Sequence, residues 1–501
     1  MWRTPTRHPP AYNPLVCRCV PAAAALLIAA CLSDPKASSD AAPDGDGGRD
    51  IDTGVGTDAL CSDSDGDGYL PAGCAGALHA DCAPDDEAVH PGAFEICGNS
   101  VDDDCFDGDV SCDDALSPNQ VSEIGGVITV TNGAYTAELT AADNYEITSL
   151  IAHGGAPDTN ELVYRGSGNE RYVGIHEWLS WYTWDVGGTP PGISHVTRGE
   201  AVVRENIEWT AADGADTSGG LSGVTYYTFH PDGRIHIDHD FDVLVGGGGP
   251  LTAFVALARD EFTHADFDGN GGGPYPITGA QNVAHEDDVF PYAEYLCAYD
   301  DTAGGAAVGW SPLVGQVTDT GAGSRISESF AGTVQIALQF DWISSGSPTG
   351  ARDGDFQLTV ARVPDSGPPC AAPAANAAAM HDPPGLDVAE PGLNYSGGVG
   401  DDNTDGYNEG GGYFDVYGGD VSATAVELTV SAIGASLPPT STYRIRGIDF
   451  AHDPVVELDG ERLSRGHDYL FHVEPFDGHG WLYLARPIAN GSVLSVEAPA
   501  P

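Results

Sequence analysis

The chain has 501 residues, and its 75 acidic side chains outnumber its 19 basic ones, which gives a formal net charge of −56. A surface this acidic repels nucleic acid and anionic lipid headgroups, and it attracts divalent cations or basic partners. We therefore exclude a nucleic-acid-binding function. The length is sufficient for more than one domain.

The first thirty residues are typical of an export signal. They carry arginines and no acidic side chain, and their apolar run, 22–30, is too short to span a membrane. The end of this run, Ile28-Ala29-Ala30-Cys31, resembles a bacterial lipobox, which implies cleavage before Cys31, lipidation of its sulfur and attachment to a membrane. Because Leu32 follows the cysteine, we expect an outer-membrane or cell-surface location. The alternative is an ordinary cleaved signal with an incidental cysteine.

Residues 31–60 consist mostly of Asp, Ser, Gly, Ala and Pro, with almost nothing to bury. This composition predicts a disordered tether.

The stretch 61–114 has the composition of a metal-binding module. It opens with Asp63-Ser64-Asp65-Gly66-Asp67-Gly68-Tyr69, in which carboxylates alternate along a glycine-containing turn, as in the oxygen cage of a hard cation such as Ca²⁺. The twelfth position of the turn is Cys74 instead of Glu, which excludes an EF-hand. Two later acidic clusters are alternative sources of the remaining oxygens. The predicted calcium ligands are the backbone carbonyl of Tyr69 and the carboxylates of Asp63, Asp65, Asp67, Asp81, Asp85, Asp86, Asp102 and Asp104.

The order of these elements is specific. D-x-D-G-D-G-Y, then D-C-x-x-D-D, then H-P-G-A-x-E-x-C-x-N-x-x-D-D-D-C resembles the metal-binding motif named after the surface protein MopE and found in secreted bacterial proteins. The resemblance implies a metal-binding, disulfide-containing module. This sequence departs from the motif at Gly98, where an Asp usually follows the cysteine. The copper chemistry of the namesake does not carry over, because the stretch lacks Trp.

The cysteines favour an oxidising compartment. After loss of two cysteines with the signal and lipidation of Cys31, an even number remains, as expected for disulfide bonds in an exported protein. Cys297 and Cys370 lie outside the module and are free to pair with each other. Connectivity stays open for the cysteines of the module, which are Cys61, Cys74, Cys82, Cys97, Cys105 and Cys112.

Residues 121–364 contain short β-type runs separated by Gly, Asn and Asp, which predicts a large antiparallel β-sandwich. In the run 234–241, alternation places His236, Asp238 and Asp240 on one face of the strand. Ile235, Ile237, His239 and Phe241 fall on the other face.

The order of the first runs, Val-Thr-Asn-Gly followed by a strand, resembles the start of the galactose-mutarotase-type supersandwich, which occurs in sugar epimerases and polysaccharide lyases. That resemblance implies an alternative function, a polysaccharide-active enzyme of lyase or epimerase type. The aromatic run 176–184 would then line a saccharide groove, although strand aromatics more often belong to the core. A lyase needs a Tyr or His base and an Arg or metal to neutralise a uronate. The candidates are His195, Arg198, Arg204, Tyr227 and His236.

The Ala- and Pro-rich segment 365–392 is predicted to be a linker. It precedes a second, weaker acidic turn at 401–409. Across 393–501, short β-type runs at regular spacing predict an immunoglobulin-like β-sandwich. Together these features predict a mainly β, lipid-anchored surface protein that binds Ca²⁺ and displays two β domains toward a glycan or protein ligand, more in keeping with binding than with catalysis.

Overall fold

The computed structural model describes most of the chain from residue 62 onward. All of the described residues belong to one compact unit, Thr57–Pro501. The expected signal, the lipidated Cys31, the tether and Cys61 lie outside them. The described ranges are 62–74, 79–106, 108–112, 115–143, 145–154, 161–164, 173–177, 192–211, 221–243, 251–268, 273–278, 283–287, 293–313, 324–328, 335–343, 350–389, 392–395, 406–418, 425–431 and 440–498.

The N-terminal module consists mainly of turns. Its regular structure is one short parallel pair, β1 (Leu70–Pro71) with β2 (Ala80–Asp81). Disulfide bonds join Cys82 to Cys105 and Cys97 to Cys112, and Cys74 is also disulfide-bonded. Few apolar side chains of the module are buried, so covalent bonds and contacts with other parts of the chain stabilise it.

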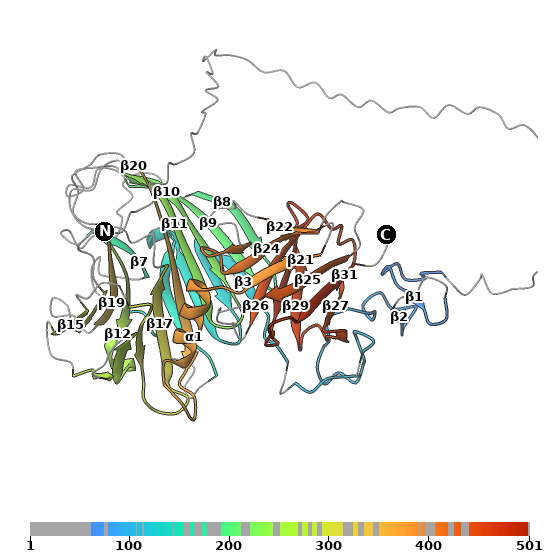
Figure 1. Cartoon of the computed structure of the whole chain (residues 1–501), viewed down its shortest axis with the longest axis horizontal. Helices are drawn as coiled ribbons and strands as arrows, with labels where there is room; N and C mark the ends of the chain where they lie inside the picture. Colours follow the sequence, from blue (N-terminus) through green and yellow to red (C-terminus); the bar gives the residue numbers. More distant parts are fainter. Residues whose placement is uncertain are drawn as a thin grey trace, which may run out of the picture. The chain divides into compact units, whose positions relative to one another are not determined.

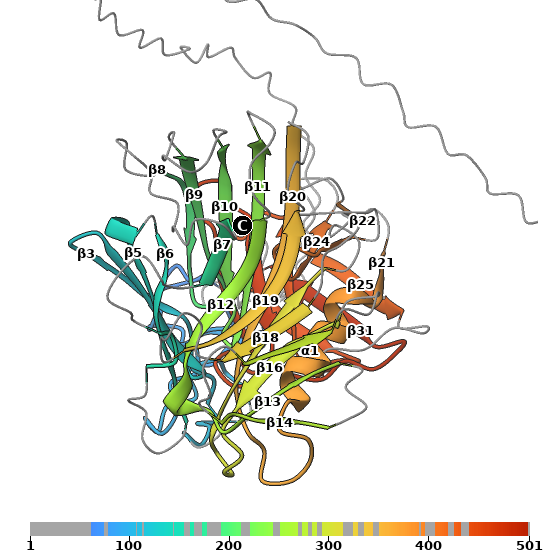
Figure 2. The same cartoon turned by 90° about the vertical axis from the view of Figure 1, so that its left-hand side faces the viewer.

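The large domain contains two antiparallel sheets, each of nine strands among the described residues, which confirms the predicted β-sandwich. Figure 2 shows β8 to β11 and β20 side by side in the first of them. In spatial order this sheet, called sheet 1, contains β14 (Tyr275–Pro276), β13 (His264–Phe267), β16 (Leu296–Tyr299), β17 (Ala306–Pro312), β20 (Gly350–Arg362), β11 (Arg234–Val243), β10 (Leu221–Phe229), β9 (Val203–Ala211) and β8 (Gly192–Arg198).

The second sheet of the large domain, called sheet 2, ends in a meander of four strands that are sequential in the chain, β3 to β6. A 3₁₀ turn, Ala141–Asp143, connects two of these strands, and another, Arg259–Glu261, follows β12. In spatial order sheet 2 contains β15 (Val283–Asp287), β18 (Ser324–Glu328), β19 (Gln335–Ile343), β12 (Leu251–Ala258), β7 (Val173–Glu177), β6 (Glu146–Ala152), β5 (Tyr135–Thr140), β4 (Val127–Thr131) and β3 (Gln120–Ile124).

Alternating side chains build the core between the two sheets. On β4 and β5 every second residue is buried, as expected for strands with one face toward a core. On β11 Ile235, Ile237 and Phe241 belong to this core, as predicted, where Trp310 stacks on Phe356 at 5.1 Å between ring centroids. His236, Asp238 and Asp240 of β11 therefore face away from the core, whereas His239 lies on the core face, 6.0 Å from Phe356 between ring centroids.

Helix α1 (Ala371–His381) occupies part of the segment predicted to be a linker, and the structure differs from the prediction here. Alanine is the strongest helix former, and Pro373 lies in the first turn, where its missing N–H removes no helical hydrogen bond. The helix packs against β17 and β20 (Figure 1), and a disulfide bond joins Cys370 at its start to Cys297 on β16. Helix α1 is therefore part of the large domain, and the end of the same segment forms a strand of the C-terminal domain, Gly385–Val388.

The C-terminal domain is the predicted two-sheet β-sandwich. Its strands enclose a separate hydrophobic core, and one pair, β24 with β26, is parallel, which the sequence did not predict. One sheet contains β21 (Gly385–Val388), β25 (Ala425–Ser431), β31 (Val493–Glu497), β27 (Val455–Leu458) and β28 (Glu461–Arg462). The other contains β22 (Leu393–Asn394), β24 (Tyr413–Tyr417), β26 (Ser441–Arg446), β30 (Gly480–Leu484) and β29 (Tyr469–Val473), with β23 (Tyr407–Asn408) beside β24.

The polar face of sheet 1 contacts the C-terminal domain through buried histidines. His230 bonds through Nδ1 to Oγ1 of Thr442 at 2.9 Å, and its Nε2 lies 3.0 Å from the carbonyl oxygen of Gly411. Nδ1 of His236 donates to the carbonyl oxygen of Glu409 at 3.0 Å. Burial lowers the pKa of both histidines well below the usual range, so both are neutral in the folded protein.

A third histidine of this interface, His472 on β29, gives a prediction for acid stability. Burial lowers its pKa to about 4, with the charge of Glu474 opposing the shift and that of Arg465 adding to it. Below the ordinary pKa of 6.5 the unfolded chain binds a proton that the folded chain does not, so stability falls as the pH falls toward 4. Between pH 7 and pH 4.5, His472→Asn should therefore lose roughly 2–3 kcal/mol less stability than wild type.

Urea unfolding of both proteins at these two pH values measures the difference. A stability gap between wild type and variant that stays constant with pH would contradict this role of His472.

Candidate metal centre

The predicted first acidic turn brings three carboxylates together. Asp63, Asp65 and Asp67 each offer an oxygen, and these oxygens lie within 4.8 Å of one another. Gly66 and Gly68 have φ values of 89° and 92°, which other residues rarely adopt, so the glycines permit the curl. Asp63 is oriented by the backbone, since Oδ1 accepts from the N–H of Gly66 at 2.7 Å and Oδ2 from that of Gly68 at 3.1 Å.

Several carboxylate oxygens of this turn and of β2 are buried without a hydrogen-bond donor. They are both oxygens of Asp65, Oδ2 of Asp67 and Oδ2 of Asp81, the last from β2. Burial raises the pKa of Asp67 and of Asp81, and the charge of Asp65 raises both further. Buried carboxylate oxygens without donors are costly unless they bind a cation, so this arrangement fits a hard divalent ion.

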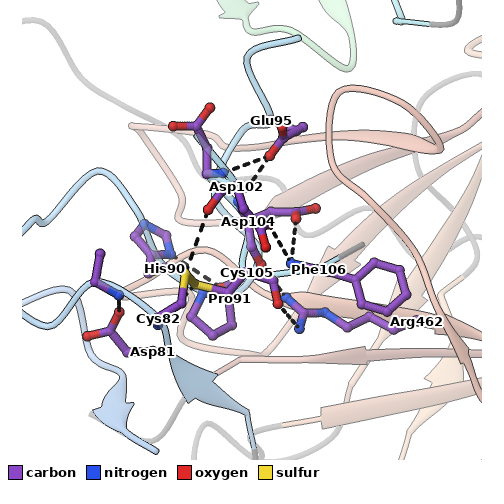
Figure 3. The surroundings of a disulfide bond; sticks show 12 residues. Asp81, Cys82, His90, Pro91, Glu95, Asp102, Asp104, Cys105, Phe106 and Arg462 are labelled. Atoms are coloured by element: carbon purple, nitrogen blue, oxygen red, sulfur yellow. Dashed lines mark hydrogen bonds between the residues drawn. A yellow bond between two sulfur atoms is a disulfide. The ribbon is translucent and has the colours of Figure 1, made fainter. Parts of the chain in front are cut away.

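The predicted third cluster is different, because its carboxylates already accept hydrogen bonds. Oε2 of Glu95 accepts from the backbone N–H groups of Asp103 and Asp104, at 2.9 and 3.2 Å. Figure 3 shows Glu95 beside Asp102 and Asp104. One oxygen each of Asp102 and Asp104 accepts from the N–H of Phe106. Glu95, Asp102 and Asp104 have oxygens within 4.8 Å of one another, but their principal partners are backbone amides. This cluster therefore orders the loop around the Cys82–Cys105 disulfide bond.

The sequence did not single out Glu95 as a candidate, although the motif contains it. The structure buries it and bonds it to the loop that carries Asp102 and Asp104. Asp85 and Asp86 are exposed and belong to neither of these carboxylate groups. Tyr69 directs its ring to the interior, where it stacks on His90 at 5.4 Å between ring centroids.

The module packs against the C-terminal domain, which lies hundreds of residues later in the chain. The hydroxyl of Tyr69 donates to the carbonyl oxygen of Asp453 at 2.5 Å. Arg462 donates to the carbonyl oxygen of Asp104 at 2.6 Å, and Oγ of Ser464 donates to Oδ2 of Asp104 at 2.7 Å. Burial raises the pKa of Asp104 to about 6, and the bond from Ser464 opposes this shift. The module is thus a docked element of the C-terminal domain.

The catalytic candidates of the alternative function whose side chains are described are divided between the two faces of sheet 1. Tyr227 belongs to the core between the sheets, whereas His236 lies on the opposite face of sheet 1. Arg204, also on that face, donates to the hydroxyl of Tyr413 at 3.1 Å, and Arg198 pairs with Glu205 at 2.6 Å. His195 lies on β8, but its side chain is not described. Residues 178–184 of the aromatic run also lie outside the described residues.

The comparisons with known proteins place the chain in no family. It matches no family model and no curated protein. In the part of the chain that the structure describes, no helix is long and apolar enough to cross a bilayer. The resemblance to the MopE-type motif stays a prediction.

Similarities to solved structures are distant. A TPR-domain-containing protein from Parabacteroides distasonis has a TM-score of 0.34 and 12% identity, over 47% of this chain and 46% of that one. A heparan sulfate lyase from Pedobacter heparinus has a TM-score of 0.30 and 11% identity, over 66% and 42% of the two chains. A galactose mutarotase-like protein from Lactobacillus casei has a TM-score of 0.29 and 13% identity, over 47% and 100%. This chain thus spans less than half the length of the first two, and likeness at this level carries no argument about function.

Proposed function

We propose that this protein is an exported, lipid-anchored surface protein whose disulfide-containing module binds Ca²⁺ and packs against β-sandwich binding domains. One observation carries the calcium part, namely the buried, donor-free carboxylate oxygens of Asp65 and Asp67 in the turn and of Asp81 on β2. The export and anchor parts rest on the sequence around Cys31 and on the disulfide bonds.

The donor set favours calcium over softer metals. Carboxylate oxygens with a glycine-rich turn suit a hard cation, whereas zinc and copper sites use cysteine sulfur or histidine nitrogen. The cysteines described in the module are held in disulfide bonds, which leaves oxygen as the principal donor. Asp63 adds a carboxylate that the amides of Gly66 and Gly68 hold in place.

Calcium binding would stabilise the folded module. The turn holds several mutually repelling carboxylates, and little apolar surface of the module is buried to offset their repulsion. A bound cation reverses the sign of these interactions, so binding and folding of the turn are coupled.

The proposal predicts a calcium-dependent stability. At a free Ca²⁺ concentration about 100 times the dissociation constant, binding adds about 2.7 kcal/mol to the stability of the site. We expect a chelator to lower the melting temperature of the purified full chain and to increase protease cleavage within 62–112. Asp65→Asn should resemble the chelated protein even in calcium.

Asp85→Asn is the matched control, because Asp85 is an exposed carboxylate of the same module. It should keep the calcium response of wild type. If chelation leaves melting and cleavage of the module unchanged in wild type, the calcium part of the proposal is wrong.

We do not propose catalysis. Tyr227 and His236, the two general-base candidates with described side chains, are buried on opposite faces of sheet 1. His236 is fully buried, and the C-terminal domain covers it at Glu409 and Gly412.

A further inference from the structure

A second group of carboxylates lies on sheet 1, far from the module in sequence. Asp238 on β11 stands directly opposite Asp355 on β20, and Asp353 is two residues from Asp355 on the same face of that strand. Each offers an oxygen within 4.8 Å of the others. The three belong to the polar face of sheet 1, opposite the hydrophobic core, because their strand neighbours Ile237 and Phe356 are core residues.

Asp238 is the most buried member of the group. Its side chain is 0% exposed, and neither of its carboxylate oxygens has a hydrogen-bond donor among the described residues. Asp355 is 1% exposed, whereas Asp353 is exposed to solvent. The group therefore runs from the surface at Asp353 to a fully buried, donor-free carboxylate at Asp238.

The groups around Asp238 provide too little positive charge to compensate its buried negative charge. Its pKa is raised well above the usual range by burial first and then by the charges of Asp353 and Asp240, while that of Arg204 opposes the shift. Arg204 is shared, since it also donates to the hydroxyl of Tyr413. Two arrangements stabilise such a group, either a proton shared between Asp238 and Asp353 or a cation bound by the carboxylates.

We propose that Asp238, Asp353 and Asp355 bind a hard divalent cation, namely Ca²⁺, at a site separate from the module. Carboxylate oxygens from three positions on two adjacent strands match the donors that such ions prefer. The exposed Asp353 provides an entry path from solvent, and the ion joins β11 to β20 on the face that contacts the C-terminal domain. A proton shared between Asp238 and Asp353 would need no metal, so the metal content of the protein distinguishes a shared proton from a bound cation.

The test is the calcium content of the purified full chain after equilibrium dialysis against CaCl₂. We expect Asp238→Asn to lose one ion per chain and to lose the part of the calcium-dependent melting shift that this ion provides. Asp65→Asn removes a different ion, so failure at the module and failure at sheet 1 are distinguishable. A double variant should lose both ions.

Two further variants make the result interpretable. Asp353→Asn changes an exposed side chain, so it should fold normally and bind the ion roughly tenfold more weakly. Asp242→Asn is the matched control, because Asp242 is an exposed carboxylate of β11 outside the group. If Asp238→Asn folds and keeps the calcium content and melting shift of the Asp242→Asn protein, the carboxylates share a proton and the proposal is wrong.

Discussion

Gly412→Ala is expected to destabilise the protein by about 2–5 kcal/mol, because both its backbone angle and its surroundings exclude a side chain. Gly412 has a φ of 69°, and a Cβ built on it would lie 2.2 Å from Nε2 of His236. The imidazole cannot move away, since it is fully buried and bonds to Gln357 at 2.9 Å and to Glu409 at 3.0 Å. Chemical unfolding of the full chain measures the loss.

The matched control for this variant is Gly460→Ala. Gly460 has a φ of 79°, yet no atom lies within 4 Å of the Cβ position. Gly460→Ala should therefore lose only the stability that the unfavourable backbone angle costs, about 1–2 kcal/mol. The difference between the two variants measures the packing of the C-terminal domain on His236. Equal losses would show that this contact is loose and that the interface contributes little.

Removing the Cys297–Cys370 disulfide bond should cost about 4 kcal/mol, the loop-closure value for a bridge over a long loop. The bond spans 73 residues and attaches α1 to β16, and both cysteines are buried beside Tyr299 and Val363. Cys297→Ala combined with Cys370→Ala removes it without leaving a free thiol. Urea unfolding under non-reducing conditions gives the change in stability.

Removal of a second, shorter disulfide bond of the same chain controls for the loss of the cysteine side chains themselves. The Cys97–Cys112 bond spans 15 residues, so its removal should cost about 3 kcal/mol. If the longer bridge proves worth less than about 1 kcal/mol, the unfolded chain must already hold α1 near β16 and the loop-closure argument fails for this domain.

The β architecture was largely predictable because it follows from alternation along single strands. Ile235 and Ile237 alternate with His236 and Asp238, and the structure places the first pair in the core and the second on the opposite face. Helix α1 was not predicted because alanine- and proline-rich composition is shared by linkers and helices. Its position depends on the fit of Pro373 against Gly309, which no local pattern encodes.

The candidate site was predictable in part. The turn at Asp63, Asp65 and Asp67 was found because its ligands are close in sequence. The carboxylates of sheet 1 were not found, because Asp238 and Asp355 become neighbours through strand pairing across more than a hundred residues. The docking of Tyr69 and Asp104 on the C-terminal domain was missed for the same reason.

This docking has a consequence for how the chain matures. Tyr69 is separated by 384 residues from its partner Asp453, and Asp104 by 360 from Ser464. The ribosome therefore releases the module long before the surface on which it rests exists. In the exported chain proposed above, the cystine-rich turns stay uncovered and open to disulfide exchange until the last strands have folded, so oxidative folding of this protein should be completed late, after the C-terminal domain has formed.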